Sequence, residues 1–373
     1  MSAPSNPDAQ PSDLPPSSVL SHIVDVHCHP TDAPDGIPAS AMDSLQISIC
    51  AMSSMQSDQG KVKALASAYP EKVTPAFGYH PWFSHLISIT ASTSAPPKET
   101  HYRTLFFPTP AAPNAAHEAQ FQALLPYLPD PCSLSTILDE VRANLTLFPN
   151  AMLGEVGLDR AFRVPIDYFA SLRILTPFTI PLEHQLRILE AQIDLAVELR
   201  RNVSVHSVKA QQQTVELLSK MKAKHGDARW NRISVDMHSC GLSVQTWRDL
   251  EKKHENVFLS LSVVINYKHA NLRELIASCD ADRILVESDF NDINMCTSWT
   301  WDMVRIISEV RGWPIETEWI EDDASLEEKD WGVIRRLWKN WLRFKNGNHP
   351  TKQKAKRNKR RDYNSEGSDI QEI

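Results

Sequence analysis

Short apolar segments recur along the chain and alternate with longer amphipathic stretches. The apolar segments predict eight β-strands, at 23–29, 45–52, 73–82, 151–159, 202–208, 232–240, 257–264 and 283–290. Amphipathic helices are indicated between several of them, at 182–201 and 270–280 for example, where apolar residues recur every three or four positions. Near-continuous apolar strands that alternate with helices are typical of a parallel sheet.

Eight such strand–helix units predict an α/β fold of the (β/α)8 type, the TIM barrel. In this fold the carboxyl ends of the strands and the loops that follow them form the active face. The alternative is an open, doubly wound sheet. The chain has no Gly-rich dinucleotide or phosphate loop that would support that alternative.

Changes in composition divide the chain. Residues 1–21 are rich in Pro and Ser and predict a disordered N-terminal segment. The barrel is expected over 22–345, with an insertion at 86–134 that is too long and Pro-rich for an ordinary loop. Because the insertion follows the third strand, we expect it to cap the barrel mouth. A helical extension is expected at 312–345.

A basic, disordered tail is predicted at 346–373. Its run "TKQKAKRNKRR" fits a nuclear-targeting or nucleic-acid contact element, or a plain solvated charge run. The whole chain carries a net charge of −7, which argues against nucleic-acid binding by its entire surface but leaves a local basic patch open.

Cysteine usage and the first residues bear on the compartment. The six cysteines include no CxxC pair, and the start lacks the basic and then apolar order of a secretory signal. No apolar run is long enough to span a bilayer. We therefore expect a cytoplasmic or nuclear protein with free thiols and no membrane association.

Candidate chemistry begins at "IVDVHCHP", residues 23–30. Alternation along a strand places Asp25, His27 and His29 on one face, so the two imidazoles stand close enough to share a metal ion. Asp25 would lie deeper in the barrel on the same face, where it could orient the ligands. The alternative is a pair of exposed histidines in a loop.

The ends of later strands supply more residues of the same chemistry. They are His80, Glu155, Asp159, His206, His238 and Asp289. Taken alone, a strand-end His is a hydrogen-bonded core residue, an Asp is a helix N-cap, and His80 is a turn residue before Pro81. Together they provide enough ligands at one barrel mouth for two divalent metal ions bridged by a carboxylate.

The motifs "DVHCHP", "AFGYHPW", "LGEVGLDR", "VSVHS", "DMHSCG" and "RILVESD" occur in this order. Over residues 23–310, apart from the insertion, the chain resembles the TatD-type metal-dependent hydrolases (TatD DNase family) of the amidohydrolase superfamily. The resemblance implies a TIM barrel that hydrolyses phosphodiesters, such as DNA, with two divalent metal ions. Zinc, manganese and magnesium all stay open.

The resemblance also implies roles for the ligands. His27, His29 and Asp289 would hold one metal, His206 and His238 the other, and Glu155 would bridge them. Asp289 would act as general base beside the catalytic Glu155. Candidates for substrate contact or ligand orientation are His80, Asp159, Asp25 and Lys209.

The chain departs from the family pattern at the substrate rim. Val208 stands where the family often has an Arg, and Lys209 is a partial substitute as a point charge. "HSCG" is one residue shorter than the family motif, and "ESDFN" replaces Glu-Thr-Asp-Ala-Pro. Two alternatives therefore stay open. One is a hydrolase of a small ester, amide or phosphate. The other is a scaffold that binds partners, since the chain is also similar to fungal TatD-like proteins that interact with an anaphase-promoting-complex subunit.

Overall fold

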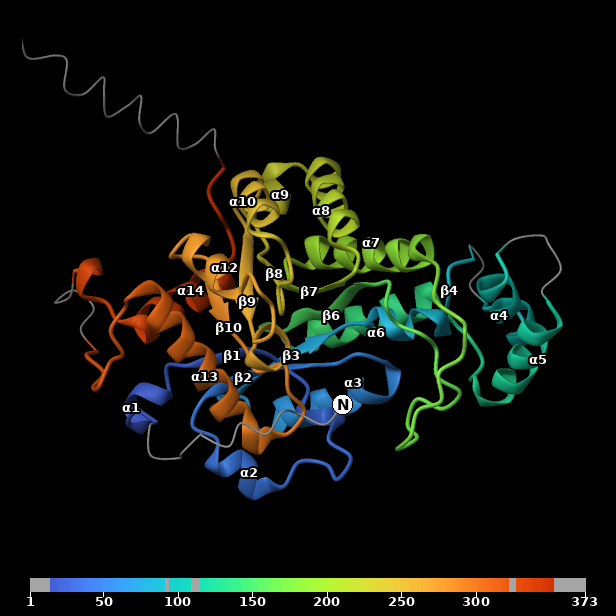
Figure 1. The fold of residues 1–373 in the computed structure, drawn as a ribbon, viewed down its shortest axis with the longest axis horizontal. Coiled ribbons are helices and arrows are strands. Elements are labelled where there is room, and N and C mark those ends of the chain that lie inside the picture. The colour runs from blue at the N-terminus through green and yellow to red at the C-terminus, as the bar shows by residue number, and fades with distance from the viewer. Residues whose placement is uncertain (1–13, 91–93, 109–113, 322–326, 352–373) are drawn as a thin grey trace, which may run out of the picture.

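The computed structural model describes residues 14–90, 94–108, 114–321 and 327–351. Parallel strands form one sheet in the order β1-β2-β3-β6-β7-β8-β9-β10 (Figure 1). The strands are β1 Val24–Cys28, β2 Ser48–Met52, β3 Val73–Phe77, β6 Met152–Asp159, β7 Val203–Val208, β8 Val235–Met237, β9 Val257–Leu261 and β10 Ile284–Val286. Each lies within one of the eight segments that the hydrophobic pattern selected.

The sheet closes between its first and last strands. The backbone N–H of Asp289 donates to the carbonyl of His27 at 3.0 Å, and that of His29 donates to the carbonyl of Phe290 at 2.8 Å. The residues that follow β10 therefore run beside the end of β1. The predicted (β/α)8 barrel is confirmed.

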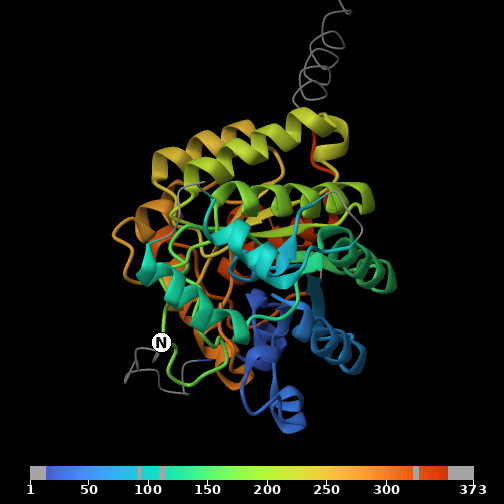
Figure 2. The same ribbon diagram turned by 90° about the vertical axis from the view of Figure 1, so that its right-hand side faces the viewer.

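Helices surround the strands and shield their apolar outer faces. The main ones are α3 Gln56–Ala68, α6 Leu134–Leu147, α7 Leu182–Leu199, α8 Gln211–His225, α10 Val244–Lys253, α12 Leu272–Ser278 and α13 Ile293–Arg311. Shorter helices are α2 Ala39–Ser44, α9 Asp227–Trp230 and α11 Val263–Asn266. α7, α8 and α10 lie side by side along one side of the barrel (Figures 1 and 2). α7 and α12 correspond to the helices predicted at 182–201 and 270–280.

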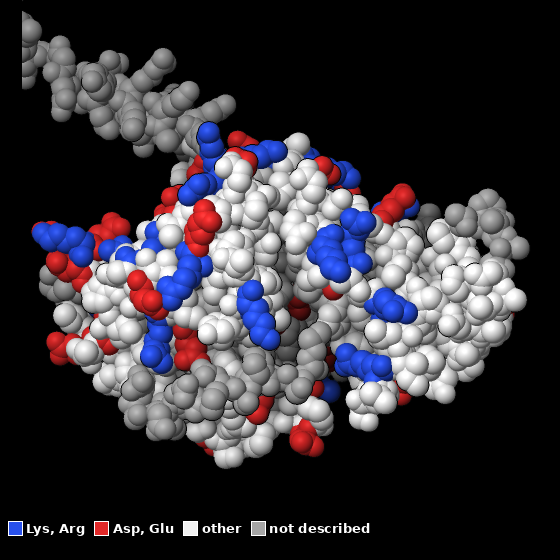
Figure 3. All heavy atoms as spheres, in the orientation of Figure 1, with Lys and Arg blue, Asp and Glu red and all other residues white. Residues whose placement is uncertain are grey.

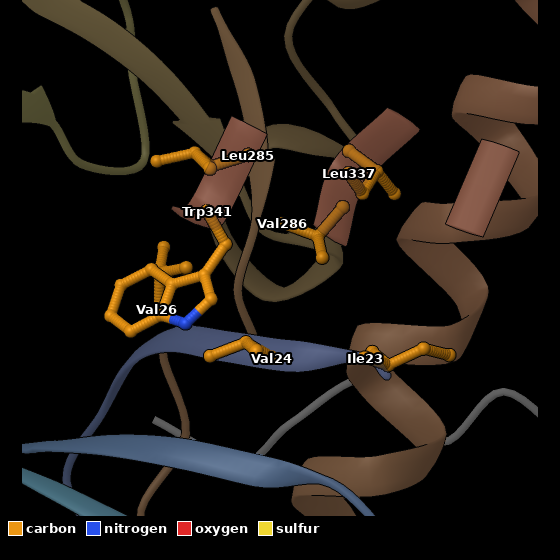
Figure 4. A pocket seen from close by; sticks show the side chains of 7 residues that line it. All are labelled: Ile23, Val24, Val26, Leu285, Val286, Leu337 and Trp341. Carbon is orange, nitrogen blue, oxygen red and sulfur yellow. The ribbon is translucent and has the colours of Figure 1, made fainter. Parts of the chain in front are cut away.

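The C-terminal helix α14 (Val333–Asn346) closes the end of the barrel at which the strands begin. Its Trp341 and Phe344 are buried against apolar side chains that strands direct into the barrel, among them Val24, Val26 and Leu285. Figure 4 shows the Trp341 ring beside Val26 and Val24, in a small apolar cavity that Leu285 and Leu337 also line. The helical extension is therefore part of the barrel core.

α14 occupies only the later part of the helical extension predicted at 312–345. A 3-10 turn, η6 (Glu328–Asp330), precedes it. The Glu316 carboxylate then accepts hydrogen bonds from the backbone N–H groups of Ile334 and Arg335, at 3.0 and 2.8 Å. A Cβ at Gly332 would lie 2.5 Å from the Pro314 carbonyl oxygen, so this close approach requires glycine. A remote carboxylate sets the helix start, which periodicity does not reveal.

The insertion is folded and braced at its base. Strands β4 (Ile87–Ser88) and β5 (Cys132–Ser133) pair where it leaves and rejoins the barrel. Its helices α4 (Lys98–Phe106) and α5 (Ala115–Leu124) pack against residues of the loop that follows β6. They lie at the end of the molecule away from α14 (Figure 1). The role of this segment as a cap stays a prediction.

Both segments predicted to be disordered, 1–21 and 346–373, include residues that are folded against the barrel. Residues 17–20 form α1 (Ser17–Leu20), whose Val19 and Leu20 are buried in the core, so disorder through residue 21 is wrong for 14–21. The Pro- and Ser-rich composition predicted disorder, but burial of these two apolar side chains is enough to order the segment. At the other end, His349 donates its backbone N–H to Asn231 and its ring nitrogen lies 2.7 Å from the Ser234 hydroxyl, so the tail does not start at 346.

The basic run at 352–361 and residues 1–13 lie outside the described residues, so nuclear targeting stays a prediction. All six cysteines are free thiols. Among the described helices, none combines the length and apolar character needed to cross a membrane.

Replacing Trp341 by Ala tests whether α14 is part of the core. Deleting a buried Trp side chain costs about 3–5 kcal/mol, so the free energy of unfolding should fall by that amount. Urea denaturation followed by circular dichroism measures it. The control is Leu147→Ala at an exposed site, which should stay within about 0.5 kcal/mol of the parent. Equal stability of the two variants would show that α14 only rests on the surface.

Candidate metal centre

A buried carboxylate, Glu155 on β6, lies at the centre of the barrel mouth and is only 4% exposed. Its Oε1 atom is 2.8 Å from Nδ1 of His206 and 2.9 Å from Nε2 of His238. Nε2 of His80 lies 3.3 Å from the same oxygen. Three strand ends thus direct imidazoles at one oxygen of the carboxylate.

The second oxygen of Glu155 faces a separate pair of imidazoles. Oε2 lies 3.0 Å from Nε2 of His29 and 3.4 Å from Nε2 of His27. Oδ1 of Asp289 stands near the same two nitrogens, at 3.7 Å from His29 and 4.0 Å from His27. Barrel closure between β10 and β1 brings Asp289 to this side.

The donor set fits divalent cations. Nε2 of His27 and Nε2 of His29 are 3.2 Å apart, and Nδ1 of His206 is 3.4 Å from Nε2 of His238. Ring nitrogens that face each other this closely need a proton or a metal ion between them. Imidazole and carboxylate are ligands that zinc and other first-row divalent metals accept.

Asp25 does not share the face of the two histidines. The register between β1 and β2 shifts between Asp25 and Cys28, as a β-bulge does. The Asp25 carboxylate therefore lies near the Cys28 and Cys296 thiols, and it accepts hydrogen bonds from the backbone N–H and the hydroxyl of Ser288. The predicted face is wrong because strict alternation does not hold across a bulge.

Neighbouring polar groups fix the orientation of the imidazoles. The Ser204 hydroxyl lies 2.8 Å from Nδ1 of His27, which leaves Nε2 free to face Glu155. The Asp159 carboxylate is 3.3 Å from Nε2 of His206 and accepts a hydrogen bond from the Trp82 indole at 2.6 Å. Asp159 thus fixes the Nε2 side of the His206 ring while the Nδ1 side faces Glu155.

Glu287 is a site residue that the sequence reasoning missed. It is fully buried, its Oε1 atom lies 3.5 Å from Nδ1 of His238, and it accepts hydrogen bonds from Ser239 and Ser260. A carboxylate behind a ligand histidine raises its basicity and fixes its tautomer. The signal was present, since Glu287 and Asp289 are two residues apart in the segment predicted as a strand (283–290) and would share a face there.

Charge interactions keep the central carboxylates ionised. Burial acts to raise the pKa of Glu155, but His80, His238 and His27 outweigh it and bring that pKa well below its ordinary value. For Asp159, burial is likewise outweighed by hydrogen bonds from His206 and Trp82, which bring its pKa to about 2. Both groups are anions at neutral pH, and a carboxylate must be ionised to bind a metal ion or to hold a ligand histidine.

Three residues other than glycine adopt left-handed backbone conformations just beyond strand ends. They are Lys209 (φ 51°), Ser239 (φ 40°) and Asp289 (φ 50°). Such conformations gather at functional sites, because the surrounding structure must hold them. The Lys209 side chain is exposed, and none of the described contacts joins it to the group around Glu155. This group, here termed the cage, comprises Glu155, Asp289, His27, His29, His80, His206 and His238.

Comparisons with known proteins identify a family and relatives of this chain. The family model described as TatD related DNase matches residues 24–318. Cut9-interacting protein scn1 of Schizosaccharomyces pombe is 31% identical over 333 residues, which cover 80% of this chain and 95% of that protein. An uncharacterized deoxyribonuclease of Saccharomyces cerevisiae is 28% identical over 284 residues, covering 73% of this chain and 84% of the relative.

Solved structures share the fold. The Escherichia coli TatD homologue YjjV superimposes with a TM-score of 0.52 at 16% identity, over 89% of this chain and 100% of its own. An uncharacterized amidohydrolase from Saccharomyces cerevisiae gives a TM-score of 0.50 at 13% identity, over 86% of this chain and 99% of its own. Since the family model spans most of the sequence, including every residue of the cage, the chain belongs to the TatD-related DNase family of metal-dependent hydrolases.

Proposed function

We propose that this protein hydrolyses phosphodiester bonds with two divalent cations that Glu155 bridges. One observation carries the proposal: the two oxygens of Glu155 face separate sets of imidazoles. A single metal ion would need only one of these sets. A carboxylate between two sets is the arrangement of a two-metal site.

The ligands divide accordingly. His27, His29 and Asp289 would hold one cation, and His206 and His238 the other. When bound, the cations supply positive charge that acidifies a water molecule and stabilises charge developing on a phosphate. His80 lies beside His206 and His238, facing the same oxygen of Glu155. Burial lowers the pKa of His80 to about 4, so its imidazole is neutral at pH 7. A neutral imidazole can donate one hydrogen bond to a substrate oxygen.

Asp289 is the proposed proton acceptor. Its side chain is 14% exposed, against 5% for Glu155, so it is the more accessible carboxylate of the cage. Its left-handed backbone turns it out of the strand at the mouth. A carboxylate there can take the proton of an attacking water and release it to solvent.

The substrate class rests on the relatives. The family description and the name of the budding-yeast relative both support DNA as the substrate. The family Arg is absent at Val208, which leaves a small ester, amide or phosphate as the alternative. Hydrolysis of single-stranded oligonucleotides, compared with that of small esters, separates the two.

A partner-binding role is a second candidate. It is supported by the name Cut9-interacting protein of a relative that aligns over 95% of its length. We propose that the chain likewise binds a protein, such as an anaphase-promoting-complex subunit. The aromatic surface of the C-terminal extension is a candidate contact, since Trp319 stacks on His22 at 3.6 Å and under Arg335 at 4.1 Å.

Calorimetric titration of the purified chain with the Cut9 counterpart of its own species tests the second role. Micromolar or tighter binding, lost in Trp319→Ala but kept in Glu155→Gln, is the expected result, because the two sites are separate. Absence of heat from the parent chain rules out this partner.

Glu155→Gln should remove the metal site. Protein purified without chelator should contain about two metal equivalents per chain by mass spectrometry of the metals, and the variant far fewer, since the amide cannot bridge two cations. The matched control is Glu251→Gln, a buried carboxylate that accepts the backbone N–H of Asp280 on the outer helices. A variant that keeps both metals would refute the bridging role.

Asp289→Asn should abolish hydrolysis while the protein stays folded. The amide keeps the shape and one oxygen ligand but cannot take a proton, and loss of a general base costs about 10²–10⁴ in rate. Steady-state cleavage of an oligonucleotide measures the effect. Asp292→Asn, at the N-cap of α13 where Asn also caps, is the control and should keep full rate. Full activity of Asp289→Asn would move the search for the base to Glu155 or Asp159.

A further inference from the structure

The loop that follows β6 forms a hairpin at the barrel mouth, here termed the rim hairpin (residues 164–178). Its two sides exchange backbone hydrogen bonds: Ile166 donates to Ile174 at 2.9 Å and Thr176 donates to Val164 at 3.0 Å. βα loops stand on the catalytic face of the barrel. The proposed chemistry uses none of the hairpin residues.

The rim hairpin is held in place from two directions. Phe178, at its base, stacks on Phe106 of the insertion, with centroids 5.0 Å apart. Tyr168, near its tip, meets the edge of Phe83 at 4.8 Å. Phe83 in turn packs against His80 of the cage, at 6.5 Å between ring centroids. The tip therefore has a fixed position relative to the metal centre.

Arg173 stands at this tip with its guanidinium over the Tyr168 ring, 4.1 Å from the centroid. The side chain is exposed, and no carboxylate of the described residues lies within ion-pair distance of it. The contact from Tyr168 through Phe83 places Arg173 on the side of the mouth that holds His80. The Asp32 carboxylate, 3.8 Å from the His29 ring, is another anionic group of this mouth.

Large apolar side chains of the hairpin face solvent beside Arg173. Phe169 is 76% exposed and Leu172 is 81% exposed. An exposed aromatic ring beside a guanidinium that has no carboxylate partner among the described residues combines two elements. Proteins bind single nucleic-acid strands through these elements, base stacking and phosphate contact. Figure 3 shows Lys and Arg side chains around a central hollow in which acidic side chains are visible.

We propose that Arg173, supported by Tyr168, binds a phosphate of a nucleic-acid strand adjacent to the phosphate at the metal centre, with Phe169 stacked on a base. This inference rests on the proposed phosphodiesterase function and adds a subsite for the nucleotide next to the cleaved bond. The guanidinium presents a planar set of donors that matches phosphate. It lies on the exposed rim while Glu155 is buried, so it contacts a flanking phosphate and not the one being cleaved.

A different role for Arg173 would be to neutralise Asp32 and the cage. In that case its loss would lower metal content and the hydrolysis of every substrate alike. A protein partner on the apolar tip would instead depend on Phe169 and Leu172 and leave oligonucleotide binding unchanged. The two roles and the proposed one differ in what each variant changes.

The experiment measures binding of a fluorescently labelled single-stranded oligonucleotide to metal-loaded protein by anisotropy. All proteins carry Asp289→Asn to suppress cleavage. Arg173→Gln should weaken binding about 10–100-fold, as expected for one charge-assisted contact, and should reduce the slope of log K against log[salt] by about 0.7. Arg173→Lys should keep most of the slope but bind more weakly than the parent. Arg248→Gln, on the outer helix α10, is the control and should bind as the parent does.

Two further readouts sharpen the test. Tyr168→Ala should weaken binding as Arg173→Gln does, and the double variant should be no weaker, because both changes remove one contact. With Asp289 intact, Arg173→Gln should hydrolyse bis(p-nitrophenyl) phosphate at the parent rate, since that ester has a single phosphate. Its metal content should also match the parent.

Distinct failures have distinct meanings. If the parent binds the oligonucleotide and Arg173→Gln binds equally well, the subsite is refuted while the proposed function stands. If Arg173→Gln loses metal or small-ester hydrolysis, Arg173 neutralises the cage and the subsite is again refuted. If the parent itself binds no oligonucleotide, the nucleic-acid substrate is refuted and the subsite with it.

Discussion

The Glu155 carboxylate, enclosed by five imidazoles, is the interaction on which the rest of the mouth depends. A buried anion is costly unless positive charge or hydrogen-bond donors compensate it. Here the compensation comes from the ends of β1, β3, β7 and β8, so the site is satisfied only when those strands end at the same height. The sheet order and the closure between β1 and β10 meet this requirement.

The barrel interior is divided between the polar cage and an apolar floor. Below the cage, Trp341 and Phe344 fill the space that the small strand residues Ala76 and Cys50 leave open. Between floor and cage, the Ser260 hydroxyl oxygen lies 2.8 Å from an Asp236 oxygen and 2.6 Å from a Glu287 oxygen. Burial raises the pKa of Asp236 well above its ordinary value, so a protonated Asp236 can donate to Ser260 while Ser260 donates to Glu287. A neutral Asp236 beside an ionised Glu287 avoids two like charges in the interior, and Glu287 then stays available to His238.

The hydrophobic pattern predicted the strands and most of the cage because both obey short-range rules. A strand buried on both faces is a continuous apolar run, and a His or Asp at its end breaks that run visibly, as at His80 and Asp289. Three features did not follow such rules. The bulge in β1 turned Asp25 to the other face of the strand, and Glu287 was overlooked in the apolar segment 283–290. The burial of Trp341 inside the barrel depends on a partner surface far away in the sequence.

The barrel mouth is divided between the cage, which strand ends position, and the surrounding rim, which loops form. The cage is set by strand ends, which tolerate no shift without losing a ligand. The rim is set by loops, which accept insertions and exchange residues freely. Here the insertion packs on the base of the rim hairpin through Phe106 and Phe178. The insertion, although far from the metal centre, therefore helps to position the rim hairpin at the barrel mouth. Under the proposed subsite, the positive charge of the mouth stands on the loop after β6, at Arg173, and not after β7, where Val208 lies. Because the net charge of −7 repels a polyanion at long range, any strand that binds must be held by such local contacts.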